Sequence, residues 1–107
     1  MEQSTKPQFP PETLLDITAV TGIASYDMST DKNRYLYRKD DKVFLVINPY
    51  TIELRTDGEL KKILTDKYES VMESRYFGRG GIEIVPAGQL SKEELYDLVR
   101  LSYNLTN

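Results

Sequence analysis

Arginines and aromatic residues occur together in two short segments, and this pairing is the strongest candidate for chemistry in the chain. The residues concerned are Arg34, Tyr35, Tyr37 and Arg38 in the first segment, and Arg75, Tyr76 and Arg79 in the second. Guanidinium groups hold phosphates and aromatic rings stack on bases, so these residues predict a nucleic-acid or anion-binding surface. The structural alternative is an edge strand protected by its charges, with the tyrosines half-buried.

The segment Gly78-Arg79-Gly80-Gly81 is rich in glycine, and backbone N–H groups in such a segment can hold an anion beside Arg79. It is not a P-loop, because no Lys-Ser/Thr pair follows and the next predicted element is a strand, not a helix. A tight turn or bulge that needs a positive φ is the structural alternative. The sequence leaves both interpretations open.

The residue types that most catalytic and metal sites use are absent. The chain has no histidine and no cysteine, which excludes a disulfide, a Cys/His zinc site and the usual base of a serine hydrolase. The carboxylates are scattered, and the segment Asp27 to Asp31 lacks the glycine and the final glutamate of a calcium-binding EF-hand loop. We therefore expect a protein that is not an enzyme and that needs no metal and no cofactor.

Length and charge set further bounds. The 107 residues fit one domain, and the formal net charge of −3 predicts weak repulsion from nucleic acid and from anionic membranes. Any nucleic-acid binding would therefore need a local basic patch. The longest apolar run is Val43 to Ile47, and no signal segment occurs at the start, so we expect a cytoplasmic protein that does not bind membranes.

The first third of the chain has weak patterns. Residues 1–10 are polar and contain two prolines, which predicts a disordered tail, and we expect residues 11–107 to form a single domain. The spacing of apolar residues over 12–21 predicts a helix. Residues 22–33 have the composition of a loop, with a short strand near 23–26 as an alternative.

The middle of the chain predicts three strands. Arg34 to Arg38 and Val43 to Ile47 form a hairpin across a polar turn, and the second strand is apolar enough to be central. After a turn at Pro49 comes the strand Ile52 to Arg55. There Ile52 and Leu54 point one way and Glu53 and Arg55 the other, which predicts one face in contact with solvent.

Two helices and one or two strands are predicted for the rest. Asp57 is placed to cap a helix, and Ser91 with Glu94 forms a capping box for the last one. The predicted buried residues of these helices are Leu60, Ile63, Leu64, Tyr68 and Val71, and then Leu95, Leu98, Val99, Ser102 and Leu105. Between the helices we expect an extended piece at Ser74 to Phe77, a turn over 78–81 and a strand at Ile82 to Ile84.

Tyr96 and Tyr103 lie beside the buried stripe of the last helix, where they either rim the core or form part of a docking surface. The order helix, three strands, helix, one or two strands, helix predicts an α+β fold. It would have two layers, with a mainly antiparallel sheet packed against helices.

Several of these segments resemble the MmcQ/YjbR-like family. The segment 52–68 is similar to the family's strand-to-helix segment, with Gly58 where a proline is usual, and the segments 90–95 and 102–105 are similar to its last helix. The resemblance covers residues 34 to 107. A weaker resemblance, through Gly80-Gly81-Ile82 and the last helix, is to the YdhG-like family. Both resemblances imply a secretion-chaperone-like fold.

Two hypotheses of function follow. The resemblance implies a bacterial cytoplasmic domain often labelled DNA-binding, which together with the arginines and tyrosines favours a non-enzymatic module linked to DNA regulation. The alternative is a protein interaction or adaptor module, either a monomer or a homodimer, with no nucleic-acid binding. Eight tyrosines in a chain without tryptophan, together with the implied architecture, motivate this alternative.

Overall fold

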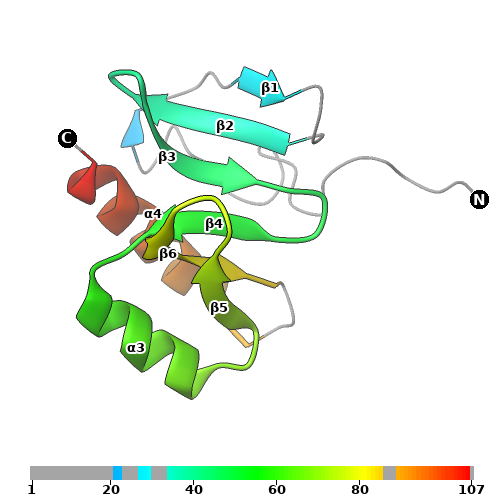
Figure 1. The fold of residues 1–107 in the computed structure, drawn as a ribbon, viewed down its shortest axis with the longest axis vertical. Coiled ribbons are helices and arrows are strands. Elements are labelled where there is room, and N and C mark those ends of the chain that lie inside the picture. The colour runs from blue at the N-terminus through cyan, green and yellow to red at the C-terminus, as the bar shows by residue number, and fades with distance from the viewer. Residues whose placement is uncertain (1–20, 23–26, 30–33, 86–88, 107) are drawn as a thin grey trace, which may run out of the picture.

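The computed structural model describes residues 21–22, 27–29, 34–85 and 89–106 of the chain. Within these residues the chain forms a six-stranded sheet and two helices (Figure 1). The predicted tail over 1–10, the alternative strand near 23–26 and all but the last residue of the predicted helix over 12–21 lie outside the described residues.

Every neighbouring pair of strands in the sheet is antiparallel, and the spatial order is β1-β2-β3-β4-β6-β5. The strands are β1 (Asp27–Ser29), β2 (Arg34–Lys39), β3 (Lys42–Ile47), β4 (Ile52–Arg55), β5 (Val71–Ser74) and β6 (Gly78–Ile84). The sequence pattern does not predict β1, because a strand of three residues at the edge of a sheet is too short to show a periodicity.

Two capped helices follow β4 and β6. Helix α3 (Gly58–Lys67) begins after Asp57, whose Oδ1 accepts a hydrogen bond from the Leu60 N–H at 2.8 Å. Helix α4 (Lys92–Leu105) begins with the predicted capping box, in which Ser91 and Glu94 each accept a hydrogen bond from the other's backbone N–H. Both predicted helix starts are therefore confirmed.

The arrangement is the predicted α+β fold, with the helices packed against the sheet. Helix α4 packs against β3 and β4, and α3 packs against β5 and β6. In Figure 1, α4 lies behind the strands, so one sheet face is turned toward the reader. Neither α3 nor α4, nor any other helix of the described residues, has the length and apolar character needed to cross a membrane.

The sheet face toward the helices, here called the inner face, holds the aliphatic core. Two rows of paired residues cross β3, β4 and β6 and bring the sheet's core residues together; one is Leu45, Leu54 and Ile82, and the other is Ile47, Ile52 and Ile84. Leu64, Leu95, Leu98 and Val99 cover them from the helices. At roughly 1.5–3 kcal/mol per buried aliphatic side chain, this face supplies most of the hydrophobic stabilisation.

Two residues predicted to be buried lie at the surface instead. Ile63 is 53% exposed because Leu60 and Leu64 form the sheet-facing line of α3, and Ile63 lies about 100° around the helix from Leu64. Leu105 is 39% exposed, since it is the last residue of α4 and lies at the end of the buried stripe.

The hairpin of β2 and β3 has the predicted turn. Asp40 and Asp41 are its two central residues, and both have positive φ, 50° and 74°. Such φ values fit a two-residue turn of the type that matches the twist of paired strands, and aspartate tolerates them better than most residues.

The segment between α3 and β6 differs from the prediction by a few residues. Helix α3 ends at Lys67, so Val71 is the first residue of β5 and not part of the helix. The extended piece expected at Ser74 to Phe77 is wrong beyond Ser74, because residues 75–77 form the turn. Gly78 to Gly81 belong to β6 and are not the turn, but Gly78 has the expected positive φ, 63°, and lies where the pairing of β5 with β6 is irregular, as in a bulge. Val71 follows Tyr68 by three residues, a spacing that fits a helix, but an apolar residue at this place also fits the start of a strand. The apolar pattern does not distinguish the two.

Candidate functional site

The outer face of the sheet, opposite the helices, carries two buried carboxylates. Glu53 on β4 and Glu83 on β6 are directly paired across the strands, and each is only 2% exposed. The prediction that Glu53 faces solvent is therefore wrong. Like charges at opposed positions destabilise a sheet unless other groups compensate them, so the partners of these two side chains decide how this face is built.

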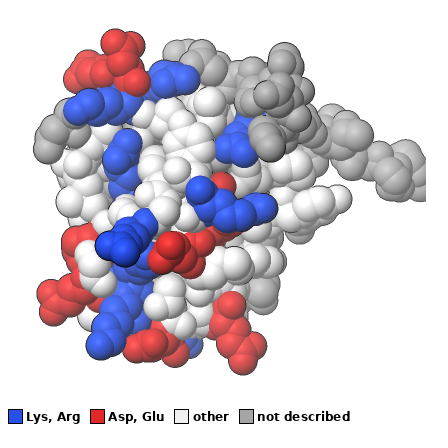
Figure 2. All heavy atoms as spheres, viewed as in Figure 1, with Lys and Arg blue, Asp and Glu red and all other residues white. Residues whose placement is uncertain are grey.

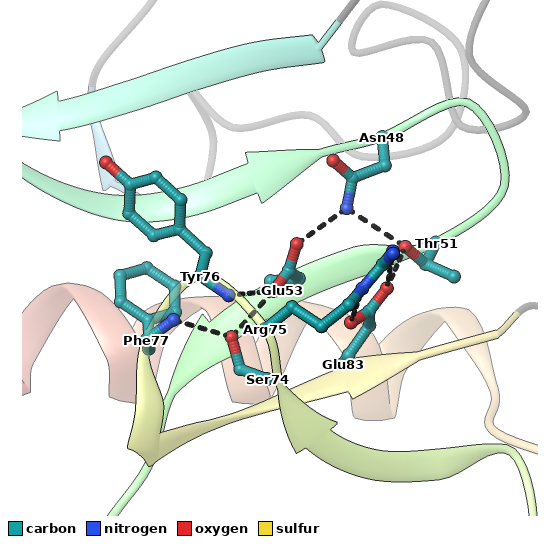
Figure 3. A network of polar contacts seen from close by, with 8 residues as sticks. All are labelled: Asn48, Thr51, Glu53, Ser74, Arg75, Tyr76, Phe77 and Glu83. Atoms are coloured by element: carbon teal, nitrogen blue, oxygen red, sulfur yellow. Dashed lines mark hydrogen bonds and ion pairs between the residues drawn. The ribbon is translucent and has the colours of Figure 1, made fainter. Parts of the chain in front are cut away.

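Glu53 is compensated by neutral donors. Its Oε1 accepts hydrogen bonds from the Ser74 hydroxyl at 2.7 Å and the Tyr76 N–H at 2.8 Å, and its Oε2 accepts one from Asn48 Nδ2 at 2.8 Å (Figure 3). Two of the three donors come from the chain around the turn between β5 and β6. Glu53 therefore fixes this turn, here defined as residues 75–77, to the outer face.

Glu83 is compensated by a cation. Arg75 holds it with two hydrogen bonds, from Nε at 3.0 Å and from Nη2 at 2.7 Å, and the Thr51 hydroxyl donates a third at 2.7 Å (Figure 3). Burial raises the pKa of Glu83, but the hydrogen bonds from Arg75 and Thr51 and the Arg75 charge outweigh it and leave that pKa below its usual value. Glu83 is therefore ionised at neutral pH.

The turn over 75–77 lies close against the sheet because of a glycine. A Cβ atom at Gly81 would come within 2.7 Å of the Phe77 Cβ and would also collide with the Leu54 carbonyl oxygen. The Phe77 N–H donates to the Ser74 hydroxyl at 2.8 Å, which joins the turn to the Glu53 network. Gly81 thus makes room for Phe77 on the outer face, and this is the structural reason for a glycine at that position.

Aromatic rings of this turn alternate with arginines in a row that we call the arginine–aromatic row. The Arg34 guanidinium lies 5.6 Å from the Tyr76 ring centroid, and the Arg55 guanidinium lies 4.9 Å from that of Phe77. The two rings meet edge to face, with centroids 5.0 Å apart. A cation and the aromatic ring that it covers attract each other at these distances. The row therefore joins β2, β4 and the turn.

An open hollow of about 570 Å³ adjoins the row. Its described lining residues are Arg34, Asn48, Pro49, Glu53, Arg75 and Tyr76. The Nε atom of Arg34 is buried and has no hydrogen-bond partner. A buried donor without a partner costs free energy, typically about 1–3 kcal/mol. The part of Arg34 that a ligand can reach is the guanidinium at the hollow, and not this buried Nε atom.

The predicted site residues fall into two groups. Arg34, Arg75 and Tyr76 come together at the hollow. The others lie elsewhere: Tyr37 is in the core, Tyr35 packs against the core, Arg38 lies exposed beside the Asp40-Asp41 turn, and Arg79 is exposed on β6. Tyr37 is only 2% exposed, so its ring cannot stack on a ligand at the surface. Of the structural alternative, the half-buried ring describes Tyr35 alone, because Tyr37 is fully buried, and β2 is not an edge strand, because it pairs with both β1 and β3.

Sequence reasoning missed Asn48, Glu53, Arg55 and Glu83 at this site. The pattern of alternating residues places Glu53 and Glu83 on one face of their strands but gives no strand pairing, and only the pairing shows that they are opposed. Tyr96 and Tyr103 are both partly buried against the core, so the core-rim interpretation of these residues is confirmed.

Charges of both signs are interspersed on the face that Figure 2 shows, and lysines and arginines alternate there with aspartates and glutamates. The described residues contain no group of three or more acidic side chains arranged to hold a metal ion. Among the described residues that line the hollow, Arg34 is the cation without a carboxylate partner, and it lies beside the neutralised pair of Arg75 and Glu83.

Comparisons with known proteins bear on the fold alone. No protein-family model and no curated protein matches the chain. A crystal structure of a protein from Pseudomonas syringae, a structural-genomics target, matches with a TM-score of 0.73 over 92% of this chain and 99% of that one, at 19% sequence identity. The α+β architecture is therefore shared with a solved structure. The resemblance to the MmcQ/YjbR-like family stays a prediction.

Proposed function

We propose that this protein is a non-enzymatic binding module that holds nucleic acid on the outer face of its sheet, in a DNA-associated regulatory role. Arg34 is the observation that carries the proposal. Its Nε atom is buried without a hydrogen-bond partner, and its guanidinium lies beside a hollow and over the Tyr76 ring. A phosphate oxygen is the acceptor that a guanidinium binds best, and a base is what an exposed ring stacks on.

The state of the carboxylates supports a binding module over an enzyme. Glu53 and Glu83 each accept three hydrogen bonds from neighbouring groups, and Glu83 is also paired with Arg75. A general base needs a carboxylate free to take a proton from a substrate. These two hold the turn in place instead, which is a structural task.

Fluorescence anisotropy with labelled DNA, at low and at physiological ionic strength, tests the proposal. We expect binding that weakens as salt rises and that Arg34→Ala reduces about tenfold, the loss of roughly one charge-assisted hydrogen bond. Arg100→Ala is the matched control, because it removes the same charge from an exposed pair with Asp97 on α4, on the other side of the sheet. Absence of binding to any nucleic acid at low salt would overturn the proposal.

A protein interaction module is the alternative, and the position of β5 favours it. This strand is at the edge of the described sheet, and Met72 on it is 41% exposed. An unpaired strand edge with an apolar side chain can pair with a strand of another protein or of a second copy. Light scattering over a range of protein concentrations tests the homodimer, which a constant monomer mass would exclude.

A further inference from the structure

We infer that the site on the outer face binds single-stranded nucleic acid, with a base stacked on Tyr76 and the adjoining phosphate held by Arg34. This inference rests on the proposed function and names its substrate class. It depends on three features of the described residues: the shape of the outer face, the distribution of its charges and the exposure of its rings.

In the part of the chain that the structure describes, the outer face offers a platform and no helix that fits a duplex groove. Both described helices pack on the inner face, whereas the arginine–aromatic row lies across β2, β4 and the turn over 75–77. Readers of duplex DNA insert a helix or a two-stranded ribbon into the major groove. A duplex also keeps its bases stacked on one another, so a ring at the protein surface finds no base face to contact. An unpaired strand exposes such faces.

The charges at this site are too few for a duplex. Duplex binding is carried largely by contacts between cations and phosphates, and each contact releases counterions. Here Arg75 is neutralised by Glu83, and the chain as a whole carries a net charge of −3. Arg34 is left as the lining cation without a carboxylate partner among the described residues. Binding with so few phosphate contacts must draw on another source of free energy.

Stacking on Tyr76 can supply that free energy. Tyr76 is 42% exposed, and three contacts set its position. The backbone N–H donates to Glu53, the ring meets that of Phe77 edge to face, and the Arg34 guanidinium lies 5.6 Å from the ring centroid. A ring held in place before binding loses little conformational entropy on contact with a base, and such a stack contributes about 1–3 kcal/mol.

The experiment compares three labelled probes of equal length by fluorescence anisotropy: an oligothymidylate, a mixed-sequence duplex, and a strand in which abasic sugars replace the bases. We expect the oligothymidylate to bind at least about tenfold more tightly than the other two. Tyr76→Ala should reduce this binding about 5- to 100-fold. Tyr76→Phe, which keeps the ring and the backbone contact, should preserve it.

The outcomes separate this inference from the proposed function. Equal binding of the duplex and the single strand, or no loss with the abasic strand, would overturn the inference and leave nucleic-acid binding standing. Absence of binding to all three probes would overturn both. Circular dichroism shows whether Tyr76→Ala is folded, and the abasic strand tests stacking on the unmodified protein even if that variant is not.

Discussion

The two faces of the sheet are built in different ways. On the inner face, aliphatic residues of β3, β4 and β6 meet aliphatic residues of α3 and α4. On the outer face the same strands present Glu53 and Glu83, which are equally buried but are held by hydrogen bonds and one arginine. Any aliphatic residue of about the right size would serve on the inner face, whereas the outer face needs particular partners.

A polar network of this kind stabilises a fold less than an apolar core of the same volume. Its retention on one face is therefore informative. Glu53 and Arg75 hold the turn over 75–77 so that Tyr76 is presented beside Arg34, as Figure 3 shows for the Glu53 network. The inner face accounts for stability, and the outer face accounts for the placement of the candidate site.

Truncation of the inner face should have the largest effect on stability. Leu54→Ala removes a fully buried side chain from the centre of the core and should lower the free energy of unfolding by about 3 kcal/mol. Urea denaturation measures this change. Ile63→Ala is the control, because Ile63 is exposed and its loss should cost about 0.5 kcal/mol or less. Equal costs for the two variants would contradict the assignment of the core.

Removal of the cation on the outer face should have the next largest effect. Arg75→Ala leaves Glu83 buried without its charged partner and should cost about 2 kcal/mol, less than a fully buried pair because the Arg75 side chain is 77% exposed. Adding Glu83→Gln to Arg75→Ala should recover part of the loss. Arg79→Ala, which removes an exposed arginine of β6 that does not contact Glu83, is the matched control in the same urea measurement. A loss as small as that of the control would mean that Arg75 does not support the outer face.

The helix caps should contribute less than either face. Ser91→Ala removes the acceptor for the Glu94 N–H and should cost about 1 kcal/mol, whereas Ser91→Asp keeps an acceptor and should cost little. Thermal unfolding of the two variants measures the difference. Because the cap is on α4, the loss should be the same with and without Arg75→Ala, and a strong coupling between the two sites would show that the faces are not independent.

The smallest expected effect is on the pH dependence of stability, to which Glu83 on the outer face contributes and the aliphatic inner face does not. The folded-state pKa of Glu83 lies below its ordinary value of 4.5, so the unfolded chain binds the proton more tightly. The stabilisation is therefore complete above the ordinary pKa and is lost as the pH falls through the folded-state value. Glu83→Gln should remove this part of the slope below pH 4.5 in denaturation curves, and Leu54→Ala should leave it in place. An unchanged slope in Glu83→Gln would contradict the assigned role of Arg75.

The inner face could be predicted from the sequence because periodicity reports which residues share a face. Leu54 and Ile82 follow such a pattern, and the caps at Asp57 and Ser91 have local signatures. The outer face could not be predicted in this way. An alternating glutamate is the ordinary sign of a solvated face, and the burial of Glu53 depends on a turn more than 20 residues further along the chain.

Of the candidate site, the types of residue were predictable but their grouping was not. Arg34 on β2 and Tyr76 in the turn over 75–77 come together only through the sheet order β2-β3-β4-β6, which no local pattern contains. Tyr37 was predicted to be a site residue but is buried in the core. The pairing of β2 with β3 has a bulge beside it. Local composition predicted one binding surface, and the structure divides the predicted residues between the hollow, the core and other exposed positions.

The most direct test of the central claim is a two-dimensional NMR titration of the labelled protein with oligothymidylate, which reports backbone amides and arginine Nε–H groups together. We expect the largest shifts at the amides of Tyr76 and Phe77 and at the Nε–H of Arg34, which belongs to the guanidinium that would hold the phosphate. The amides of α3 and α4, on the inner face, should be unaffected. Shifts concentrated on the helices, or no shifts at all, would contradict the account of the outer face as the binding surface.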